Sequence, residues 1–125
     1  MTEEHNRPLM DAERRLARWM LEHGTTAEAE QYLAQLERAE VTPWKCSCGC
    51  VSMRFQIQGH AKAPPGVHIL GDFLIGEGYH LGGAFIYSSG GLLSGIEFYG
   101  LAGDATRQLP RPEDLRPHSV PMIRK

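Results

Sequence analysis

The side chains best able to do chemistry in this chain are its three cysteines, which stand together in the segment Cys46-Ser47-Cys48-Gly49-Cys50. Thiolates bind soft metal ions, attack electrophiles and exchange disulfides. The spacing of one residue is shorter than the two to four residues typical of structural zinc sites. Two cysteines so spaced on a straight strand lie roughly 7 Å apart. A shared ion therefore requires a bend, which Gly49 could provide.

A zinc site built on these cysteines needs a fourth ligand, for which His60, His68 and His80 are the candidates. Redox chemistry is less favoured, because no helix N-terminus follows the cluster to lower the pKa of a thiol. A nucleophilic cysteine would need a base such as His60 or His80 beside it. The structural alternative is that the cysteines are small apolar residues in a crowded turn. The sequence leaves the metal site and the crowded turn both open.

Two acids in strand-like segments are further candidates for a binding role. Strand alternation places Glu97 on one face together with Leu93 and Tyr99. A strand acid is usually solvated or paired with a base on the next strand, for which Arg54 is the candidate. Asp72 raises the same question one strand earlier. A small enzyme would need these acids or a histidine to converge in one pocket.

Composition excludes several classes of function. The net charge of −2 gives no electrostatic footprint for nucleic acid. No run of eighteen apolar residues is present, so a membrane span is not expected. The acidic, polar N-terminus is unlike a secretory signal, which leads us to expect a cytoplasmic protein with reduced cysteines. The glycine pairs after residue 75 are not followed by a helical pattern, so no phosphate-binding loop is predicted.

The periodicity of apolar residues divides a single domain into two parts. Residues 1–7 are polar and predicted to be disordered, and residues 8–40 show a helical period. These form a helical hairpin, with Thr25 and Glu28 as a capping box for the second helix. Residues 41–104 change to a period of two and contain only seven charged side chains, so the sheet and most of the core are expected there.

Four strands are predicted in that second part, at 51–57, 67–75, 81–88 and 92–99. Their connections are too short for crossover helices, so the pairing is expected to be antiparallel. Gly71 is a candidate bulge. Residues 105–125 hold four of the eight prolines and are predicted to be an extended tail that crosses an edge or the open face of the sheet, anchored by Leu109 and Leu115. An exposed edge strand could also pair with a second copy in a homodimer.

The predicted fold is α+β, with the helical hairpin packed on one face of a four- or five-stranded, mainly antiparallel sheet. The predicted core consists of Leu16, Trp19, Met20, Leu33, Leu36, Val51, Met53, Phe55, Ile57, Ile69, Phe73, Phe85, Ile96 and Phe98.

The chain resembles a family of small bacterial proteins in its stretch from Glu13 to Gly24, in the Cys-x-Cys-Gly-Cys-x-Ser motif of residues 46–52 and in the Leu-Ser-Gly-Ile-Glu-x-Tyr strand of residues 93–99. No activity is assigned to that family, so the resemblance implies no function. The last strand alone is similar to strands of immunity proteins from bacterial toxin systems. This second likeness would imply a protein partner.

The sequence leaves three functions open, in decreasing order of expectation. The first is a non-enzymatic protein-binding module, for which an immunity-like role is one form, because no catalytic constellation is recognisable. The second is a zinc-binding protein centred on Cys46, Cys48 and Cys50. The third is a small enzyme that uses Glu97, Asp72 or a histidine as acid or base.

Overall fold

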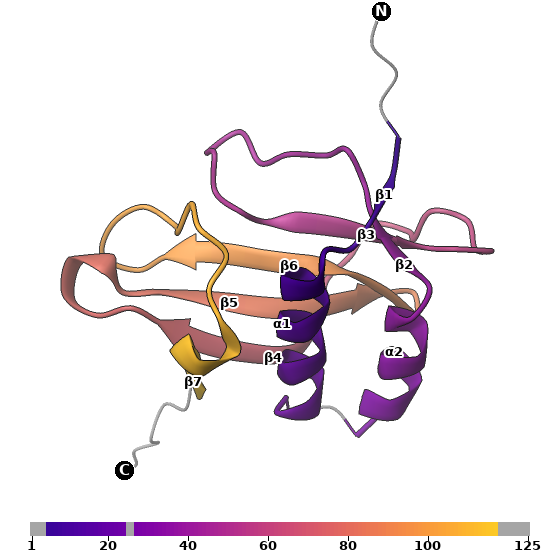
Figure 1. Ribbon diagram of the computed structural model, residues 1–125, viewed down its shortest axis with the longest axis horizontal. Coiled ribbons are helices and arrows are strands. Elements are labelled where there is room, and N and C mark those ends of the chain that lie inside the picture. The colour runs from indigo at the N-terminus through magenta and orange to yellow at the C-terminus, as the bar shows by residue number, and fades with distance from the viewer. Residues whose placement is uncertain (1–4, 25–26, 118–125) are drawn as a thin grey trace, which may run out of the picture.

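Seven strands form one antiparallel sheet in the computed structural model of the protein, which describes residues 5–24 and 27–117 (Figure 1). The spatial order of the strands is β1-β2-β3-β6-β5-β4-β7. The elements are β1 (Arg7–Pro8), α1 (Asp11–Glu22), α2 (Ala29–Leu36), β2 (Ala39–Val41), β3 (Met53–Ile57), β4 (His68–Ile75), the 3-10 turn η1 (Gly78–His80), β5 (Gly82–Ser89), β6 (Leu92–Gly100), the 3-10 turn η2 (Pro112–Asp114) and β7 (Arg116–Pro117). The predicted α+β class is confirmed.

Both helices lie against one face of the sheet (Figure 1). Helix α1 carries acids in its first turn, where they interact favourably with the positive end of the helix dipole. It buries Leu16, Ala17, Met20 and Leu21 against the sheet. Helix α2 buries Tyr32 and Leu36. The helical hairpin is therefore present as predicted. The predicted capping box is wrong in its position, because α2 begins at Ala29 with Glu28 as its N-cap; Thr25 itself lies outside the described residues.

The sheet has more strands than the four or five predicted, because three short ones carry no periodic signal. Strand β2 lies in the stretch assigned to the helical hairpin and pairs with β3. Arg7 and Pro8, predicted as disordered and helical respectively, form β1 and pair with β2. The tail contributes β7, which pairs with Phe73 and Leu74 of β4 at the opposite edge. Strands of two or three residues cannot show a period of two.

The four long strands occur where the sequence predicts them, and the β5–β6 hairpin turns at Gly90-Gly91. Both glycines have positive φ angles, of 60° and 81°. A two-residue turn with two positive φ values matches the twist of antiparallel strands, and residues other than glycine are strained there.

Two register shifts change which side chains face the helices. The predicted bulge at Gly71 is present in β4, between Ile69 and Gly71, and it turns Leu70 into the core while Ile69 becomes 45% exposed. A second shift lies opposite Tyr87 and Ser88 in the β5–β6 pair. As a result Leu93 is buried on the helical side, and the prediction that it shares a face with Glu97 and Tyr99 is wrong.

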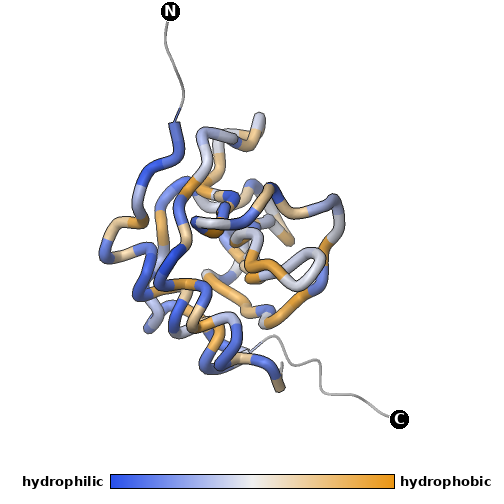
Figure 2. The backbone as a smooth tube through the Cα atoms, turned by 90° about the vertical axis from the view of Figure 1, so that its right-hand side faces the viewer, coloured by the Kyte–Doolittle hydropathy of each residue, from blue (hydrophilic) through white to orange (hydrophobic). Residues whose placement is uncertain are grey.

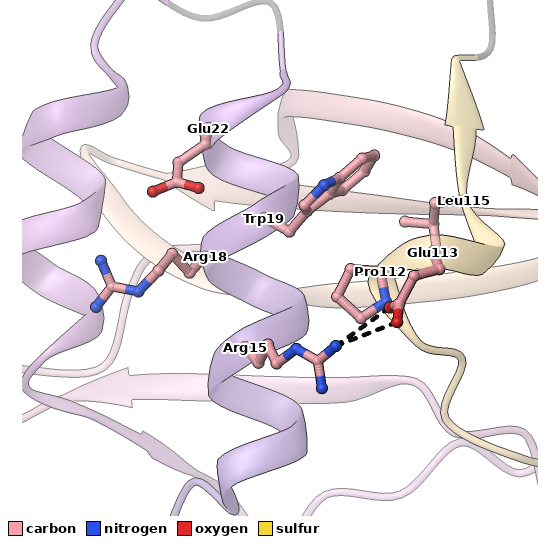
Figure 3. Close-up of a pocket in the computed structure, with 7 residues that line it drawn as sticks. All are labelled: Arg15, Arg18, Trp19, Glu22, Pro112, Glu113 and Leu115. Atoms are coloured by element: carbon pink, nitrogen blue, oxygen red, sulfur yellow. Dashed lines mark hydrogen bonds and ion pairs between the residues drawn. The ribbon is translucent and has the colours of Figure 1, made fainter.

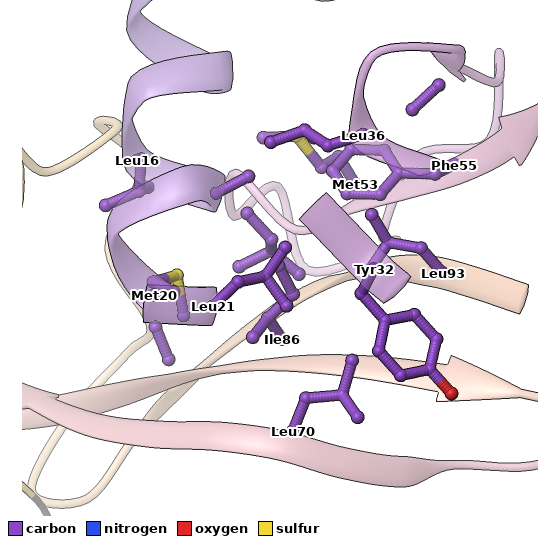
Figure 4. Packing of buried hydrophobic residues seen from close by; sticks show 14 of the residues in the cluster. Leu16, Met20, Leu21, Tyr32, Leu36, Met53, Phe55, Leu70, Ile86 and Leu93 are labelled. Carbon is purple, nitrogen blue, oxygen red and sulfur yellow. The ribbon is translucent and has the colours of Figure 1, made fainter. Parts of the chain in front are cut away.

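The core lies between the helices and the sheet (Figure 4). Hydrophobic and hydrophilic residues alternate along the backbone tube, as elements with one buried side require (Figure 2). Nine predicted core residues are buried: Leu16, Met20, Leu36, Met53, Phe55, Ile57, Phe73, Ile96 and Phe98. Trp19, Leu33 and Val51 pack against this core while partly exposed. The prediction that Ile69 and Phe85 belong to the core is wrong, because both side chains face away from the helices.

The tail packs beside α1 after crossing the end of the sheet. Leu115 is buried and Leu109 packs against the core, as predicted. Arg15 of α1 forms an exposed ion pair with Glu113 at 3.3 Å, over a hollow of about 550 Å³ between α1 and the tail (Figure 3). No helix in the described ranges is long and apolar enough to cross a bilayer.

Candidate metal centre

The three cysteines lie in the connection between β2 and β3, which is anchored at both ends. On the first side, the guanidinium of Arg54 lies 4.0 Å from the centre of the Trp44 ring. Such a cation–π contact ties the loop to strand β3. On the second side, the N–H of Val51 donates to the carbonyl of Thr106 at 3.2 Å. The segment between these anchors is held in place without being part of the hydrophobic core.

A tight turn brings the cysteines together. The N–H of Gly49 donates to the carbonyl of Cys46 at 3.1 Å, and Gly49 has a φ of 85°. A side chain at Gly49 would also collide with the guanidinium of Arg107, which lies over the turn. Glycine is thus favoured by the left-handed backbone, and a larger residue would also displace the Arg107 guanidinium. The bend expected at Gly49 is present.

The sulfur atoms converge closely enough to share one ion. The Sγ atoms of Cys46 and Cys48 are 2.9 Å apart, and the three Sγ atoms lie within 4.8 Å of one another. Two thiolates on one tetrahedral zinc, at about 2.3 Å from the metal, are about 3.8 Å apart. The Sγ atoms of Cys46 and Cys48 would have to separate by about 0.9 Å to hold an ion, which side-chain rotation can provide. The separation of roughly 7 Å expected for a straight strand does not apply, because the segment is a turn.

The thiols hold protons unequally. Hydrogen bonds with the thiols of Cys46 and Cys50 raise the pKa of Cys48 to about 11. Partial burial opposes ionisation of Cys50, but hydrogen bonds with Cys48 and with Ser52 outweigh it and lower the pKa of Cys50. Of these two thiols, Cys50 is therefore the one that loses its proton more readily. A bound cation would favour ionisation of all three thiols.

Two basic residues belong to or lie over the turn. Lys45 is exposed and directly precedes Cys46, and the guanidinium of Arg107 lies over Gly49. Cys50 also lines a cleft of about 530 Å³, together with Trp44, Lys45 and Ser52. Small molecules can thus approach at least one sulfur through this cleft, while Cys48 is exposed directly to solvent.

The predicted histidine ligands do not join the site. His60 follows β3, His68 begins β4 and His80 ends η1. Among residues 5–24 and 27–117, the group of side chains able to hold one ion contains only the three cysteines. These histidines are suggested as ligands by their residue type alone, and residue type does not tell how far a side chain lies from the cysteines in the fold.

The other candidate residues lie on the sheet face away from the helices. The Oη atom of Tyr99 donates to Oδ1 of Asp72 at 2.9 Å. Burial and then this hydrogen bond raise the pKa of Tyr99 to about 12. Glu97 is exposed and pairs with Phe85, which also pairs with Asp72 on its other side. Asp72 and Glu97 thus lie on the two strands that flank Phe85, in register with it. Sequence spacing does not suggest this arrangement.

Arg107 and Ser52 are residues at the site that sequence reasoning missed. Arg107 belongs to an irregular segment far along the chain, and no periodicity or motif connects it with the cysteines. Ser52 stands in the Cys-x-Cys-Gly-Cys-x-Ser motif, but its role depends on burial: its Oγ accepts the N–H of Phe98 at 2.8 Å while contacting Cys50.

No protein-family model matches this chain, and neither a curated protein nor a solved structure matches it. Function must therefore be inferred from the cysteine turn and the sheet face themselves.

Proposed function

We propose that this protein binds a soft metal ion through the thiolates of Cys46, Cys48 and Cys50. The observation that carries the proposal is the convergence of three sulfurs within 4.8 Å in a turn that is held at both ends. Soft thiolate ligands favour zinc and Cu(I) over hard cations such as Mg²⁺ and Ca²⁺.

The surroundings support a bound thiolate complex electrostatically. Several thiolates on one ion carry net negative charge, and the turn has two cations: Lys45, next to Cys46 in the chain, and Arg107, whose guanidinium lies over Gly49. Favourable Coulomb interactions at a partly exposed site amount to about 1 kcal/mol per pair. The two cations therefore help the turn to lose protons and accept an ion, without providing a ligand themselves.

The site differs from a structural zinc centre. Structural zinc is four-coordinate and contributes folding energy directly. Here the core consists of residues from the helices and strands and includes no cysteine. We therefore expect the protein to stay folded when the ion is removed. Binding of an ion to the folded state alone raises the unfolding free energy by mass action, and any change beyond that should be less than about 1 kcal/mol.

The test is titration of the metal-free protein with Zn²⁺ against a chromophoric zinc indicator, with a parallel count of reactive thiols. One equivalent of zinc should bind and protect the three cysteines from a thiol reagent. Cys48→Ser should lose most of this affinity. Ser47→Ala is the matched control, since Ser47 is an exposed member of the same turn without a sulfur. Zinc binding that is equal in the two variants would contradict the proposal.

A second candidate is the protein-binding role expected first from the sequence, and one observation favours it. Partly exposed Phe85 lies with its ring centre 5.7 Å from that of buried Tyr87 and 6.1 Å from that of partly exposed Tyr99, on the face opposite the helices. Exposed Arg54 and Glu97 border these rings. Aromatic residues ringed by polar ones are enriched at protein interfaces.

A photo-crosslinking amino acid at position 97 tests this candidate, with one at Glu30 on the helical layer as control. A specific partner would crosslink at position 97 and not at position 30, and Phe85→Ala should abolish the adduct. Equal crosslinking at both positions, or none at position 97, would contradict a binding role for this face.

A further inference from the structure

The number of ligands in the cysteine turn distinguishes between soft ions. Across the described ranges, three thiols and no fourth histidine, cysteine, aspartate or glutamate make up the group that can hold one ion. Structural zinc takes four protein ligands, whereas catalytic zinc keeps one position open for water or substrate. Cu(I) is a softer ion that prefers sulfur and is satisfied by fewer ligands. The turn provides a complete set for Cu(I) and an incomplete one for zinc.

Resting on the proposed metal-binding function, we infer that the ion is Cu(I), bound by Cys46, Cys48 and Cys50 alone and open to exchange with an incoming thiolate. Binding converts three thiols to thiolates, forms three Cu–S bonds and releases up to three protons. Copper enters and stays in the +1 state, so no oxidant or reductant takes part.

The charges near the turn suit this complex. Three thiolates around Cu(I) carry a net charge of −2, and two cations belong to the same turn: Lys45 precedes Cys46 in the chain, and the Arg107 guanidinium lies over Gly49. The same ligands around Zn²⁺ would carry a charge of −1. The more highly charged complex gains more from each neighbouring cation. Replacing Arg107 by glutamine should therefore weaken Cu(I) binding several-fold and zinc binding less.

The exposure of the sulfurs indicates how the ion would leave. Cys48 is exposed, Cys46 and Cys50 are half-buried, and Cys50 also faces the cleft. A thiolate arriving from solvent can form a bond to copper before the bond to Cys48 breaks. Neither step changes the electron count of the metal. The exposure of Cys48 therefore favours acquisition and transfer of Cu(I).

The experiment is an anaerobic titration of the full chain with Cu(I) in competition with a chromophoric Cu(I) chelator, beside a zinc titration under the same conditions. We expect one equivalent of Cu(I), held at least about 100-fold more tightly than zinc. X-ray absorption should count three sulfur ligands. Cys48→Ser should lose at least about 10-fold in affinity for Cu(I), and Ser47→Ala should retain it. Circular dichroism checks that each variant is folded.

The outcomes separate the two proposals. One equivalent of zinc with Cu(I) bound no more tightly would overturn the copper assignment and leave metal binding standing. Failure to bind either ion would overturn both. Two sulfur ligands by X-ray absorption, or full Cu(I) affinity in Cys48→Ser, would overturn the three-thiolate site. Copper that a small thiol cannot remove within minutes would contradict the exchange role.

Discussion

The buried carboxylate of Glu13 allows a quantitative test of how the N-terminal segment is fixed to the fold. Its side chain is 5% exposed and accepts three hydrogen bonds: from Nη1 of Arg7 at 2.9 Å, from Nη2 of Arg7 at 2.8 Å and from the N–H of Met10 at 2.8 Å. Burial opposes its ionisation, but these hydrogen bonds outweigh burial, so the pKa of Glu13 is below its usual value.

Glu13→Gln preserves volume and an acceptor for Met10 but places amide hydrogens against the guanidinium of Arg7. Hydrogen bonds to charged groups contribute about 1.5–3 kcal/mol each. Arg7 is 46% exposed and can recover hydration, which reduces the loss. We expect the unfolding free energy to fall by about 2 kcal/mol, or about 1 M in the urea midpoint. Arg7→Met should cost at least as much, because it leaves a buried carboxylate without its cation.

Urea unfolding followed by tryptophan fluorescence and circular dichroism measures both changes. The control is Glu22→Gln, which removes the same charge from an exposed site on the same helix and should change stability by less than about 0.5 kcal/mol.

The pH dependence provides an independent check. A carboxyl with a lowered folded pKa stabilises the protein above its unfolded pKa, near 4.3, and this stability is lost as the pH falls through the folded value. The gap between the wild type and Glu13→Gln should therefore narrow below about pH 4. A gap smaller than about 0.5 kcal/mol at pH 7, or one that does not change with pH, would refute the reasoning.

Three further predictions concern the sheet. Ser52→Ala should cost about 1–3 kcal/mol in urea unfolding, because it leaves the buried N–H of Phe98 without its acceptor; an unchanged midpoint would contradict this. Gln35→Ala removes both hydrogen bonds from α2 to the start of β6, of 2.9 and 2.7 Å, so amide exchange should accelerate there and not at the far end of the strand. Asp72→Asn should lower the pKa of Tyr99 from about 12, read by ultraviolet absorbance with Tyr99→Phe as reference, and no shift would show that burial alone sets it.

Local periodicity is sufficient for the elements that carry a long signal. The helical hairpin and strands β3 to β6 follow from patterns of 3.6 and two, and their turns follow from glycine. The faces of β4 and β6 cannot be obtained in this way. A single extra residue in an antiparallel pair reverses every side chain beyond it, so knowing that Gly71 is a bulge candidate does not place Ile69. Strand order also depends on long-range pairing, which puts β3 between β2 and β6.

The candidate site, like the fold, has a part that local sequence predicts and a part that depends on long-range contacts. The cysteines can be selected from sequence because they are neighbours in the chain, so no fold is needed to bring them together. The predicted histidine ligands depend on the fold, and the structure does not place them in the group. Arg107 lies on the turn through a tertiary contact between irregular segments, and no pattern in the sequence indicates it.

The length of the loop that carries the cysteines argues that it does more than connect two strands. Strands β2 and β3 are antiparallel neighbours, and hairpin loops of two to five residues usually join such strands. Here the connection runs from residue 42 to residue 52, and its two anchors, Trp44 under Arg54 and Val51 on Thr106, hold it at each end. The segment between them buries nothing in the core yet is kept in a left-handed glycine turn. A defined turn outside the core favours a preformed ligand set over a structural filler, because ordering those residues has an entropic cost that core packing does not offset.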